Sequence, residues 1–340
     1  MKIAIHHREG SFSERWISYC IEHNISYKIV NAYKSDIIAQ VADCNAFMWH
    51  FHHADYRDMQ MAKGLILSLE AKGIRCFPNS TTCWHFDNKV WEKYLLEAVG
   101  APLVPSYVFY TEEEALKWAE STTFPKVFKL KGGAGASNVK LVRTCGEAKK
   151  IIKQCFGKGF RQYRWHEQLQ EAWRRYKTKQ GTLRELLRPI KYGLCRYPTP
   201  FDHYHGREIG YAYFQDYIPK NRTDFRVKVV NGNCWAFQRK VREGDFRASG
   251  SGQLLFDNSQ IPTTLIKRAQ AVANSLNVQS VAFDFIYDKT SKQYVIVEIS
   301  YGFGFDNREC GNGYWDNKGT FHTEIFNPFN WMVDILIDSL

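Results

Sequence analysis

Residues 281–287 read Val-Ala-Phe-Asp-Phe-Ile-Tyr, and residues 293–299 read Gln-Tyr-Val-Ile-Val-Glu-Ile. These apolar runs predict two antiparallel strands joined by a Lys/Thr/Ser turn. Each strand carries one acid, Asp284 or Glu298, where a lone carboxylate would be costly to bury or would lose its charge. Two carboxylates at the same level of adjacent strands favour a divalent-cation site, and hard oxygen ligands favour Mg²⁺ bridging nucleotide phosphates.

A hairpin is predicted upstream of these acids. Residues 224–230 and 233–241 are largely apolar runs joined by Asn231-Gly232, the pair typical of a type I′ turn. The hairpin also carries Arg226 and Arg239. An ion pair of these acids with Arg226 or Arg239 is the alternative to metal binding.

A glycine-rich stretch lies earlier in the chain, where Lys129-Leu-Lys-Gly-Gly-Ala-Gly-Ala-Ser-Asn-Val139 follows one apolar strand and precedes another. Glycines allow successive backbone amides to point at phosphate oxygens, and lysines add positive charge. The stretch lacks the Gly-x4-Gly-Lys-Ser/Thr pattern of P-loop proteins, and no helix follows it as in a dinucleotide-binding turn. It therefore predicts a phosphate-binding turn, with a glycine-rich hairpin turn that binds nothing as the alternative.

The N-terminal part of the chain alternates short apolar runs with segments of helical period. This βα rhythm predicts a small parallel sheet covered on both faces, whose ligands would lie beyond the carboxyl ends of the strands. The predicted strands are 2–5, 27–30, 46–49 and 75–77, and the predicted helices are 12–23, 35–42 and 56–72.

Five histidines follow the ends of two of these strands. They predict one wall of a pocket for an anionic substrate. A metal site is the less favoured interpretation, because no acidic ligand accompanies the histidines. The alternative is that several are exposed loop residues. The five are His6, His7, His50, His52 and His53.

Length and composition are those of a globular protein, with 340 residues, 44% apolar and 24% charged side chains. No stretch approaches the roughly 18 apolar residues of a membrane span, and the chain opens as a strand rather than a signal peptide, so we expect a soluble cytoplasmic protein. Nine scattered cysteines without a Cys-x-x-Cys pair argue against a disulfide scaffold or zinc ribbon. The net charge of +11 favours an anionic partner.

Most of this charge lies in one segment. Residues 158–196 hold eleven Lys or Arg against three Glu, a net charge of 11 − 3 = +8. Tyr163, Trp165, Trp173 and Tyr176 are interleaved with the cations, as in a platform that binds a polyanion. A solvated helical insertion whose aromatic residues pack on the body is the alternative.

The order of these features resembles the ATP-grasp family. The resemblance comprises a lysine before the central domain, the strand-Lys-Gly-rich turn, Gln215-Asp-Tyr-Ile-Pro219, Asp-x-Arg-Val from Asp224, an arginine followed by Glu-Gly-Asp-Phe-Arg, and the final Asp and Glu-x-polar pair. It extends to about residue 305 and looks closest to the branch of glutathione synthetase and the ligases that add glutamate to a ribosomal protein. The ending Glu298-Ile-Ser-Tyr-Gly-Phe-Gly304, with Gly-Tyr-Trp-Asp316, also looks like uncharacterised bacterial members associated with surface polysaccharides.

The resemblance implies an α/β chain with the α+β ATP-grasp architecture. Residues 1–86 would form a doubly wound αβ domain, residues 87–215 a small ATP-binding lobe with a basic helical insertion at 158–205, and residues 216–340 a large catalytic lobe. ATP would lie between the antiparallel sheets of the two α+β lobes.

The resemblance also implies which residues bind the nucleotide. Residues 216–218 would form a hinge whose backbone reads adenine while Tyr217 packs on its face, and Asp224 would approach the ribose or a cation. The implied ATP-binding residues are Lys89, Lys129, Lys131, Gly132, Gly133, Ala134, Gly135, Ser137, Gln215, Asp216, Tyr217, Ile218 and Asp224.

For catalysis, the resemblance implies Arg226 and Arg239, which would hold the γ-phosphate and the acyl phosphate. Lys240 is the third predicted catalytic residue, and we expect it beside Arg239 near the acid substrate. Mg²⁺ would be bound by Asp284, Glu298 and Ser300. The family usually has Asn where Ser300 stands, and the glutamate-ligase branch has Asn where Ser249 stands. Because a hydroxyl binds Mg²⁺ less firmly than an amide oxygen, the number of ions, one or two, stays open.

The function implied is an ATP-dependent carboxylate-amine ligase that forms an amide through an acyl phosphate and releases ADP and phosphate. The partners would be a small-molecule or glycan-linked carboxylate and an amine, such as an amino acid added to an acidic sugar; nucleic acid is not expected, and a homodimer is left open. A ligase for protein tails, a kinase on the same fold and a non-catalytic polyanion-binding protein with a nucleotide pocket are the alternatives. Besides the five histidines, the residues expected near the substrate are Arg242, Arg247, Ser249 and Asp316.

Overall fold

The computed structural model describes residues 1–132, 138–161, 168–169, 172–173, 176–177, 181–193, 200–241 and 253–337, without the side chains at 192, 193 and 202. Within these residues the chain forms two compact units. The large unit comprises Met1–His52, Arg57–Val104 and Ile218–Leu340, and the small unit comprises His53–Tyr56 and Pro105–Tyr217. Each unit has its own sheets and its own apolar core.

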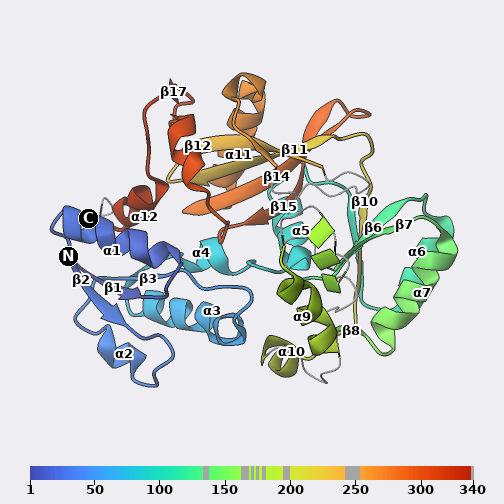
Figure 1. Ribbon diagram of the computed structural model, residues 1–340, viewed down its shortest axis with the longest axis horizontal. Coiled ribbons are helices and arrows are strands. Elements are labelled where there is room, and N and C mark those ends of the chain that lie inside the picture. The colour runs from blue at the N-terminus through green and yellow to red at the C-terminus, as the bar shows by residue number, and fades with distance from the viewer. Residues whose placement is uncertain are drawn as a thin grey trace. The chain divides into compact units, whose positions relative to one another are not determined.

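The N-terminal part of the large unit is a parallel sheet with flanking helices, as the βα rhythm predicts. In spatial order its strands are β2 (Ser26–Val30), β1 (Lys2–His6), β3 (Ala46–Trp49) and β4 (Arg75–Phe77), and each neighbouring pair is parallel. Its helices are α1 (Phe12–Glu22), α2 (Ile37–Gln40), α3 (Tyr56–Ala71) and α4 (Ser80–Cys83). Helix α1 buries Phe12, Trp16 and Cys20, which form one stripe at helical spacing, and lies beside the C-terminal helix α12 (Pro328–Ile337) (Figure 1).

The rest of the large unit is built on an antiparallel sheet of seven described strands. In spatial order they are β15 (Gln293–Ser300), β14 (Ser280–Asp288), β11 (Thr223–Val230), β12 (Asn233–Lys240), β16 (Tyr314–Trp315) and β17 (Phe321–His322), and β13 (Leu254–Leu255) also pairs with β12. The short helices η1 (Asn258–Gln260) and η2 (Asn307–Asn312) lie in its connections. Asn231 and Gly232 both have positive φ, 50° and 77°, which confirms the type I′ turn predicted between β11 and β12.

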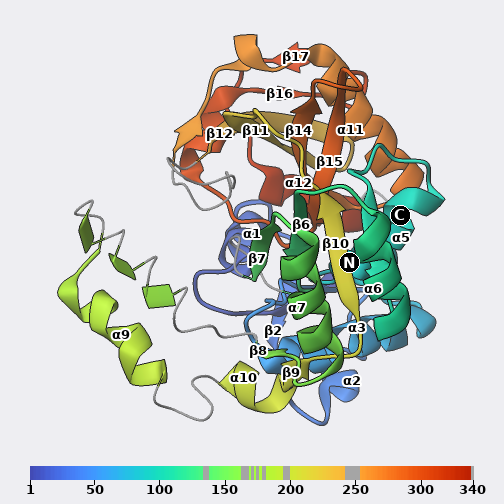
Figure 2. The ribbon, with the colours of Figure 1, turned by 90° about the vertical axis from the view of Figure 1, so that its right-hand side faces the viewer.

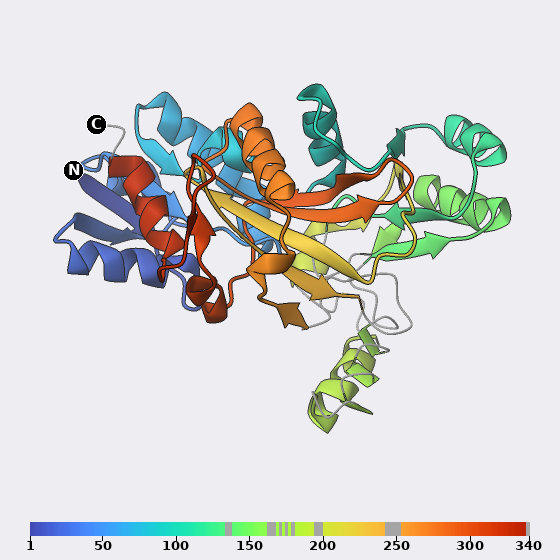
Figure 3. The same ribbon diagram turned by 90° about the horizontal axis from the view of Figure 1, so that it is seen from above.

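The two faces of this sheet differ because side chains alternate along each strand. One face packs against α11 (Thr263–Leu276) and apolar residues of α5 (Lys89–Ala98) and includes Val227, Phe283 and Ile299. Figure 3 shows α11 lying along the sheet. The opposite phase places Arg226 of β11, Arg239 of β12, Asp284 of β14 and Glu298 of β15 together on the other face.

The small unit is an antiparallel sheet with two helices on one face. Phe128, Phe214 and Ala212 of the sheet pack with Ala115, Ala148 and Ile152 of these helices. In spatial order the strands are β5 (Ser106–Phe109), β10 (Ala212–Asp216), β6 (Lys126–Lys129) and β7 (Val139–Val142), and the helices are α6 (Glu112–Ser121) and α7 (Cys145–Phe156). A second sheet pairs β8 (Phe160–Arg161) with β9 (Arg207–Glu208), and α9 (Leu183–Gly193) and α10 (Pro200–His205) lie between these strands in the chain.

The division of the chain differs from the predicted boundary at residue 87. Helix α5 belongs to the large unit, because Leu95 and Leu96 pack in the core of the seven-stranded sheet and the Val104 backbone N–H bonds the Ile296 carbonyl at 2.9 Å. The main segment of the small unit therefore begins at residue 105. Its end, between Tyr217 and Ile218, falls within the segment predicted as a hinge.

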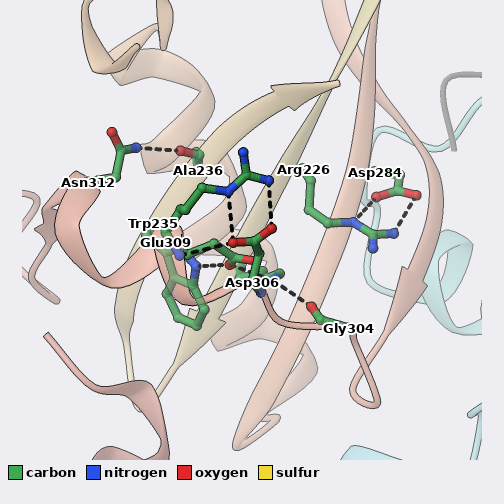
Figure 4. Close-up of polar contacts among 10 residues, drawn as sticks. Arg226, Trp235, Ala236, Asp284, Gly304, Asp306, Glu309 and Asn312 are labelled. Atoms are coloured by element: carbon green, nitrogen blue, oxygen red, sulfur yellow. Dashed lines mark hydrogen bonds and ion pairs between the residues drawn. The ribbon is translucent and has the colours of Figure 1, made fainter. Parts of the chain in front are cut away.

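A buried ion pair fixes the loop that follows β15. Lys228 is fully buried, and its Nζ donates to Glu309 Oε2 at 2.6 Å and to the Gly304 carbonyl at 2.7 Å. The indole N–H of Trp235 donates to the same Glu309 oxygen at 2.7 Å (Figure 4). The rings of Trp235, Phe237, Phe303 and Phe305 surround the ammonium. Burial lowers the pKa of Lys228 to about 8, although Glu309 opposes that change.

Replacing Lys228 by Met should destabilise the protein by about 3–5 kcal/mol, because it leaves the buried Glu309 carboxylate without its cation. The double variant K228M/E309Q should recover part of this loss, since no isolated charge remains. The control Lys267→Met changes an exposed lysine of α11 and should have little effect. Urea unfolding followed by tryptophan fluorescence measures the differences; equal midpoints for K228M and the wild type would exclude a structural role for the pair.

Candidate active site

A row of charged side chains crosses three neighbouring strands of the large unit. Glu298 of β15 pairs in register with Asp284 of β14, and Asp284 pairs with Arg226 of β11. Directly paired residues project from the same face of a sheet. The predicted alignment of the two acids is therefore present, with a cation as the third member of the row.

Both carboxylate oxygens of Asp284 are held by arginines. Arg226 makes two parallel bonds to it, from Nε to Oδ1 at 2.7 Å and from Nη2 to Oδ2 at 2.8 Å (Figure 4). Arg239 Nη2 lies 2.9 Å from Asp284 Oδ2, and its Nε donates to Asp224 at 2.8 Å. The ion pair that the sequence offered as an alternative to metal binding is thus formed, with both arginines.

These contacts keep Asp284 ionised despite its burial. Burial alone would raise the pKa of Asp284, but Arg226 and Arg239 outweigh that effect and lower it well below its usual range. Burial raises the pKa of Asp224 against the opposing effect of Arg239. The pKa of the Arg239 guanidinium rises because Asp284 and Asp224 outweigh the cost of burying it. Two arginines and two aspartates therefore form one closed network.

Helix α5 places a second set of ionisable groups beside Glu298. Asn88 caps the helix by accepting from the Val90 and Trp91 N–H groups, so Lys89 begins its first turn and Glu92 follows one turn later. Lys89 Nζ lies 3.2 Å from Glu298 Oε1, and Glu92 accepts the Ile299 N–H at 3.3 Å. The pKa of Lys89 rises because Glu298 and Glu92 outweigh its burial.

The raised pKa keeps Lys89 charged, whereas a raised pKa favours the neutral form of Glu92. Burial and the nearby Glu298 raise the pKa of Glu92 to about 8, although Lys89 opposes the change. Glu92 is 4% exposed. Near neutral pH it is therefore mainly protonated. Nothing in the sequence distinguishes Glu92 from a solvated helix residue except its position three residues after Lys89, on the same side of α5.

The predicted metal ligands Asp284, Glu298 and Ser300 offer two carboxylates and one hydroxyl. Ser300 lies two residues after Glu298 and so shares its face of β15. Among the described residues, no group of three or more His, Cys, Asp or Glu side chains is arranged to hold a metal ion. A set of two acids and a hydroxyl suits Mg²⁺, which keeps several waters and takes further ligands from phosphates.

In the small unit, the two predicted lysines, Lys129 and Lys131, and a third lysine are held by polar partners. Lys129 Nζ donates to Gln215 Oε1 at 2.6 Å, and Gln215 in turn donates to Ser106 Oγ at 3.1 Å. Lys129 and Gln215 point away from α6 and α7, because Phe128 and Phe214 take the helix-facing positions. Lys126, which the sequence did not single out, binds Asp216 at 2.6 Å.

The start of the glycine-rich turn is fixed through Tyr211. The Lys131 N–H donates to the Tyr211 hydroxyl at 2.8 Å, and that hydroxyl donates to Glu208 Oε2 at 3.0 Å. The ammonium of Lys131 lies 3.2 Å from the same carboxylate. Gly132 is described, whereas the predicted residues Gly133, Ala134, Gly135 and Ser137 lie outside the described part of the chain.

Two predicted side chains are not on the charged face. Lys240 follows Arg239 directly in β12, so alternation places it on the opposite face from the arginine cluster, and it is exposed. The prediction that it joins Arg226 and Arg239 is therefore not supported. Asp316 bonds the Lys318 and Thr320 N–H groups and lies 3.1 Å from His322 Nε2, so it closes its own turn. Arg242, Arg247 and Ser249 lie outside the described residues.

The five histidines do not form one wall. His6 is buried, accepts the Ala32 N–H at 3.0 Å and has a pKa that burial lowers to about 4. His50 Nδ1 accepts a hydrogen bond from the Phe12 N–H, and the rings of His50 and Phe12 stack with their centroids 3.6 Å apart. His7 meets Ser13 Oγ at 3.1 Å, and the His52 N–H binds Asp58. His53 belongs to the small unit, whereas the other four belong to the large unit.

Comparisons with known proteins address the fold. No protein-family model and no curated protein sequence matches the chain. Solved structures match it along nearly its whole length. A RimK domain ATP-grasp protein from Sphaerobacter thermophilus is 13% identical with a TM-score of 0.56, over 99% of each chain. The chain has the ATP-grasp fold.

Two further structures with this fold show the range of its members. D-alanine–D-alanine ligase from Bacillus anthracis, complexed with ATP, is 12% identical with a TM-score of 0.55, over 99% of this chain and 96% of that one. The ATP-grasp ligase PsnB with a minimal precursor is 11% identical with a TM-score of 0.54, over 100% of this chain and 99% of that one. Another PsnB structure also contains Mg and ADP. At these identities the comparisons establish the shared fold.

The raised pKa of Glu92 predicts a pH-dependent effect of Glu92→Gln. Between its ordinary value of 4.5 and about 8, the folded protein keeps a proton that the unfolded chain releases, so stability falls as pH rises through this window. Glutamine does not titrate, so E92Q should gain about 2 kcal/mol or more over the wild type between pH 5 and pH 7.5. Glu97→Gln, an exposed change on the same helix, is the control. Chemical unfolding at each pH tests this; parallel curves for E92Q and the wild type would contradict it.

Proposed function

We propose that this protein is an ATP-dependent carboxylate-amine ligase that forms an amide through an acyl phosphate and releases ADP and phosphate. The observation that carries the proposal is the row formed by Glu298, Asp284 and Arg226, with Arg239 bound to the same aspartate. Acids that bind a metal and cations that bind phosphate are needed next to one another for phosphoryl transfer. The ATP-grasp fold, seen in ligases bound to ATP and to Mg and ADP, supports this assignment.

The residues we assign to Mg²⁺ are Asp284, Glu298 and Ser300. Bound there, the ion would neutralise charge on the phosphate that is transferred. Asp284 has to give up at least one arginine contact to serve as a ligand, because Arg226 and Arg239 occupy both of its oxygens. A guanidinium released from a carboxylate fits phosphate oxygens with the same two-pronged geometry.

The chain's own residues then orient and stabilise the reacting groups. Arg226 and Arg239 spread the charge that develops on the phosphate while a substrate carboxylate oxygen attacks phosphorus and ADP leaves. The amine nitrogen next attacks the acyl carbon, the phosphate departs and the nitrogen loses a proton. We assign Lys129 and Lys131 to the phosphates, since Gln215 and Tyr211 fix their positions. We also assign Lys89, Gln215 to Ile218, Asp224 and the turn 132–137 to the nucleotide.

For the acid substrate we propose an acidic sugar or glycan precursor, to which an amino acid or similar amine is joined. The support is the cationic segment 158–196, which supplies +8 of the net charge of +11. A uronic-type carboxylate is the anion that such a segment would attract.

Trapping with hydroxylamine tests the reaction type. With MgATP, hydroxylamine and a panel of acids that includes uronic acids, we expect acid-dependent ADP release together with a hydroxamate. Asp284→Asn and Glu298→Gln should each lower the rate roughly 100-fold or more, as removal of charge stabilisation does. Asp288→Asn, at the far end of β14 where the side chain only bonds its own turn, is the matched control.

The same assay separates the alternatives. A stable phosphoester without hydroxamate would indicate a kinase, and ADP release that requires an acidic peptide would indicate a ligase for protein tails. Nucleic-acid binding that weakens steeply with salt, without ATP turnover, would indicate a polyanion-binding protein and contradict the proposal.

Calorimetry of Asp284→Asn tests the metal assignment separately. The wild type should bind ADP more tightly with Mg²⁺ than without it. In D284N the gain in ADP affinity caused by Mg²⁺ should fall by at least roughly 10–100-fold, which is the loss seen even when a residue that only hydrogen-bonds to a metal ligand is replaced. ADP alone should still bind to D284N, because Arg226 and Arg239 no longer have a carboxylate that competes with phosphate. An unchanged effect of Mg²⁺ in D284N would contradict the assignment.

A further inference from the structure

Helix α9 of the small unit exposes a continuous apolar stripe. Leu183, Leu187 and Ile190 are 57%, 54% and 42% exposed, whereas Leu186 on the same helix is 8% exposed. Spacings of four and three residues place the exposed three on one side of a helix. Figures 2 and 3 show α9 standing apart from the layer of α6 and α7. Scattered apolar residues are common on surfaces, but a contiguous stripe indicates a contact surface.

A cationic stripe runs next to the apolar one. Arg184, Arg188 and Lys191 each follow one residue after an apolar member, so they lie about 100° further around the helix. Glu185 is the acid of α9, so the helix has three cations against one acid. The arrangement is an amphipathic helix whose polar side is positive.

Aromatic residues precede α9 in the same segment. Trp173 is 49% exposed and Tyr176 is 42% exposed, and their rings stack with centroids 6.3 Å apart. Trp and Tyr are the residues that favour the interface of a membrane with water, because each ring is apolar with one polar group.

We propose that α9 is a membrane-docking helix that lies in the surface of an anionic lipid bilayer. Leu183, Leu187 and Ile190 enter the boundary between headgroups and acyl chains, and the cations of the adjacent stripe lie at the level of the lipid phosphates. Apolar and basic faces side by side are the pattern of helices that bind in the plane of such a membrane.

The chemistry of the two stripes favours lipid over other anionic partners. A nucleic acid backbone pairs with arginines and lysines but offers no cover for three aliphatic side chains. A membrane satisfies both stripes at once. Among the described residues, no helix is long and apolar enough to cross a membrane.

Vesicle co-sedimentation of the full chain, without nucleotide, tests the proposal. The probes are vesicles of phosphatidylcholine alone and of phosphatidylcholine with about one third phosphatidylglycerol, a fraction typical of strongly anionic membranes. We expect binding to the anionic vesicles, little to the neutral ones, and a loss of binding as salt rises. Because no nucleotide is present, the result is independent of the proposed ligase reaction.

Matched variants assign the binding to α9. Leu187→Gln/Ile190→Gln should weaken binding to anionic vesicles by about tenfold or more, since it removes two of the three inserted side chains. The control Ile21→Gln/Leu67→Gln removes one exposed isoleucine and one exposed leucine from the large unit, 60% and 55% exposed, and should bind like the wild type. Circular dichroism confirms that both variants are folded.

Three outcomes would overturn the proposal. They are no binding of the wild type to anionic vesicles at low salt, equal binding to neutral and anionic vesicles, and equal binding of the α9 variant and the wild type. Capture of an acidic protein or nucleic acid without vesicle binding would assign α9 to that partner instead.

Discussion

One buried carboxylate shared by two arginines constrains the large unit. Asp284 lies in an apolar strand and is 7% exposed, so it stays ionised only if cations reach it. Arg226 and Arg239 come from the next two strands of the sheet, β11 and β12. The three side chains must therefore share one face, and the apolar side chains of the same strands take the other, where α11 packs. The electrostatic requirement and the hydrophobic requirement thus fix the same strand phase.

Much of this could be predicted from the sequence, because it depends on local patterns. The pairing of Asp284 with Glu298 is predicted from two apolar runs that each carry one acid and are joined by a short turn. The β11–β12 turn follows from Asn231-Gly232, where two consecutive positive φ angles are needed. Other features depend on partners distant in the chain. Glu92 reads as a surface helix residue, and only the approach of Glu298 and the Ile299 N–H distinguishes it.

Errors arose where proximity along the chain was taken for proximity in space. Lys240 was grouped with Arg239 because the two are adjacent, but adjacent residues of a strand face opposite ways. His6 follows the same rule, since its place in β1 directs it into the core. Helix α5 was assigned by chain order to the small ATP-binding lobe, although its apolar side completes the core of the seven-stranded sheet in the large unit. Lys228 gave no signal, because its partner Glu309 lies 81 residues away.

The charge balance of the site bears on how a nucleotide would enter it. Among the described residues, Arg226, Arg239 and Lys89 face the carboxylates of Asp284, Asp224 and Glu298, three charges of each sign. Glu92 adds no full charge near neutral pH, because its pKa is raised to about 8. A divalent cation alone would leave this group of side chains with excess positive charge, and a bare triphosphate would leave it with excess negative charge. A metal ion that binds together with phosphates changes the net charge of the site least. Arg226 and Arg239, once released from Asp284, can then bind phosphate oxygens instead.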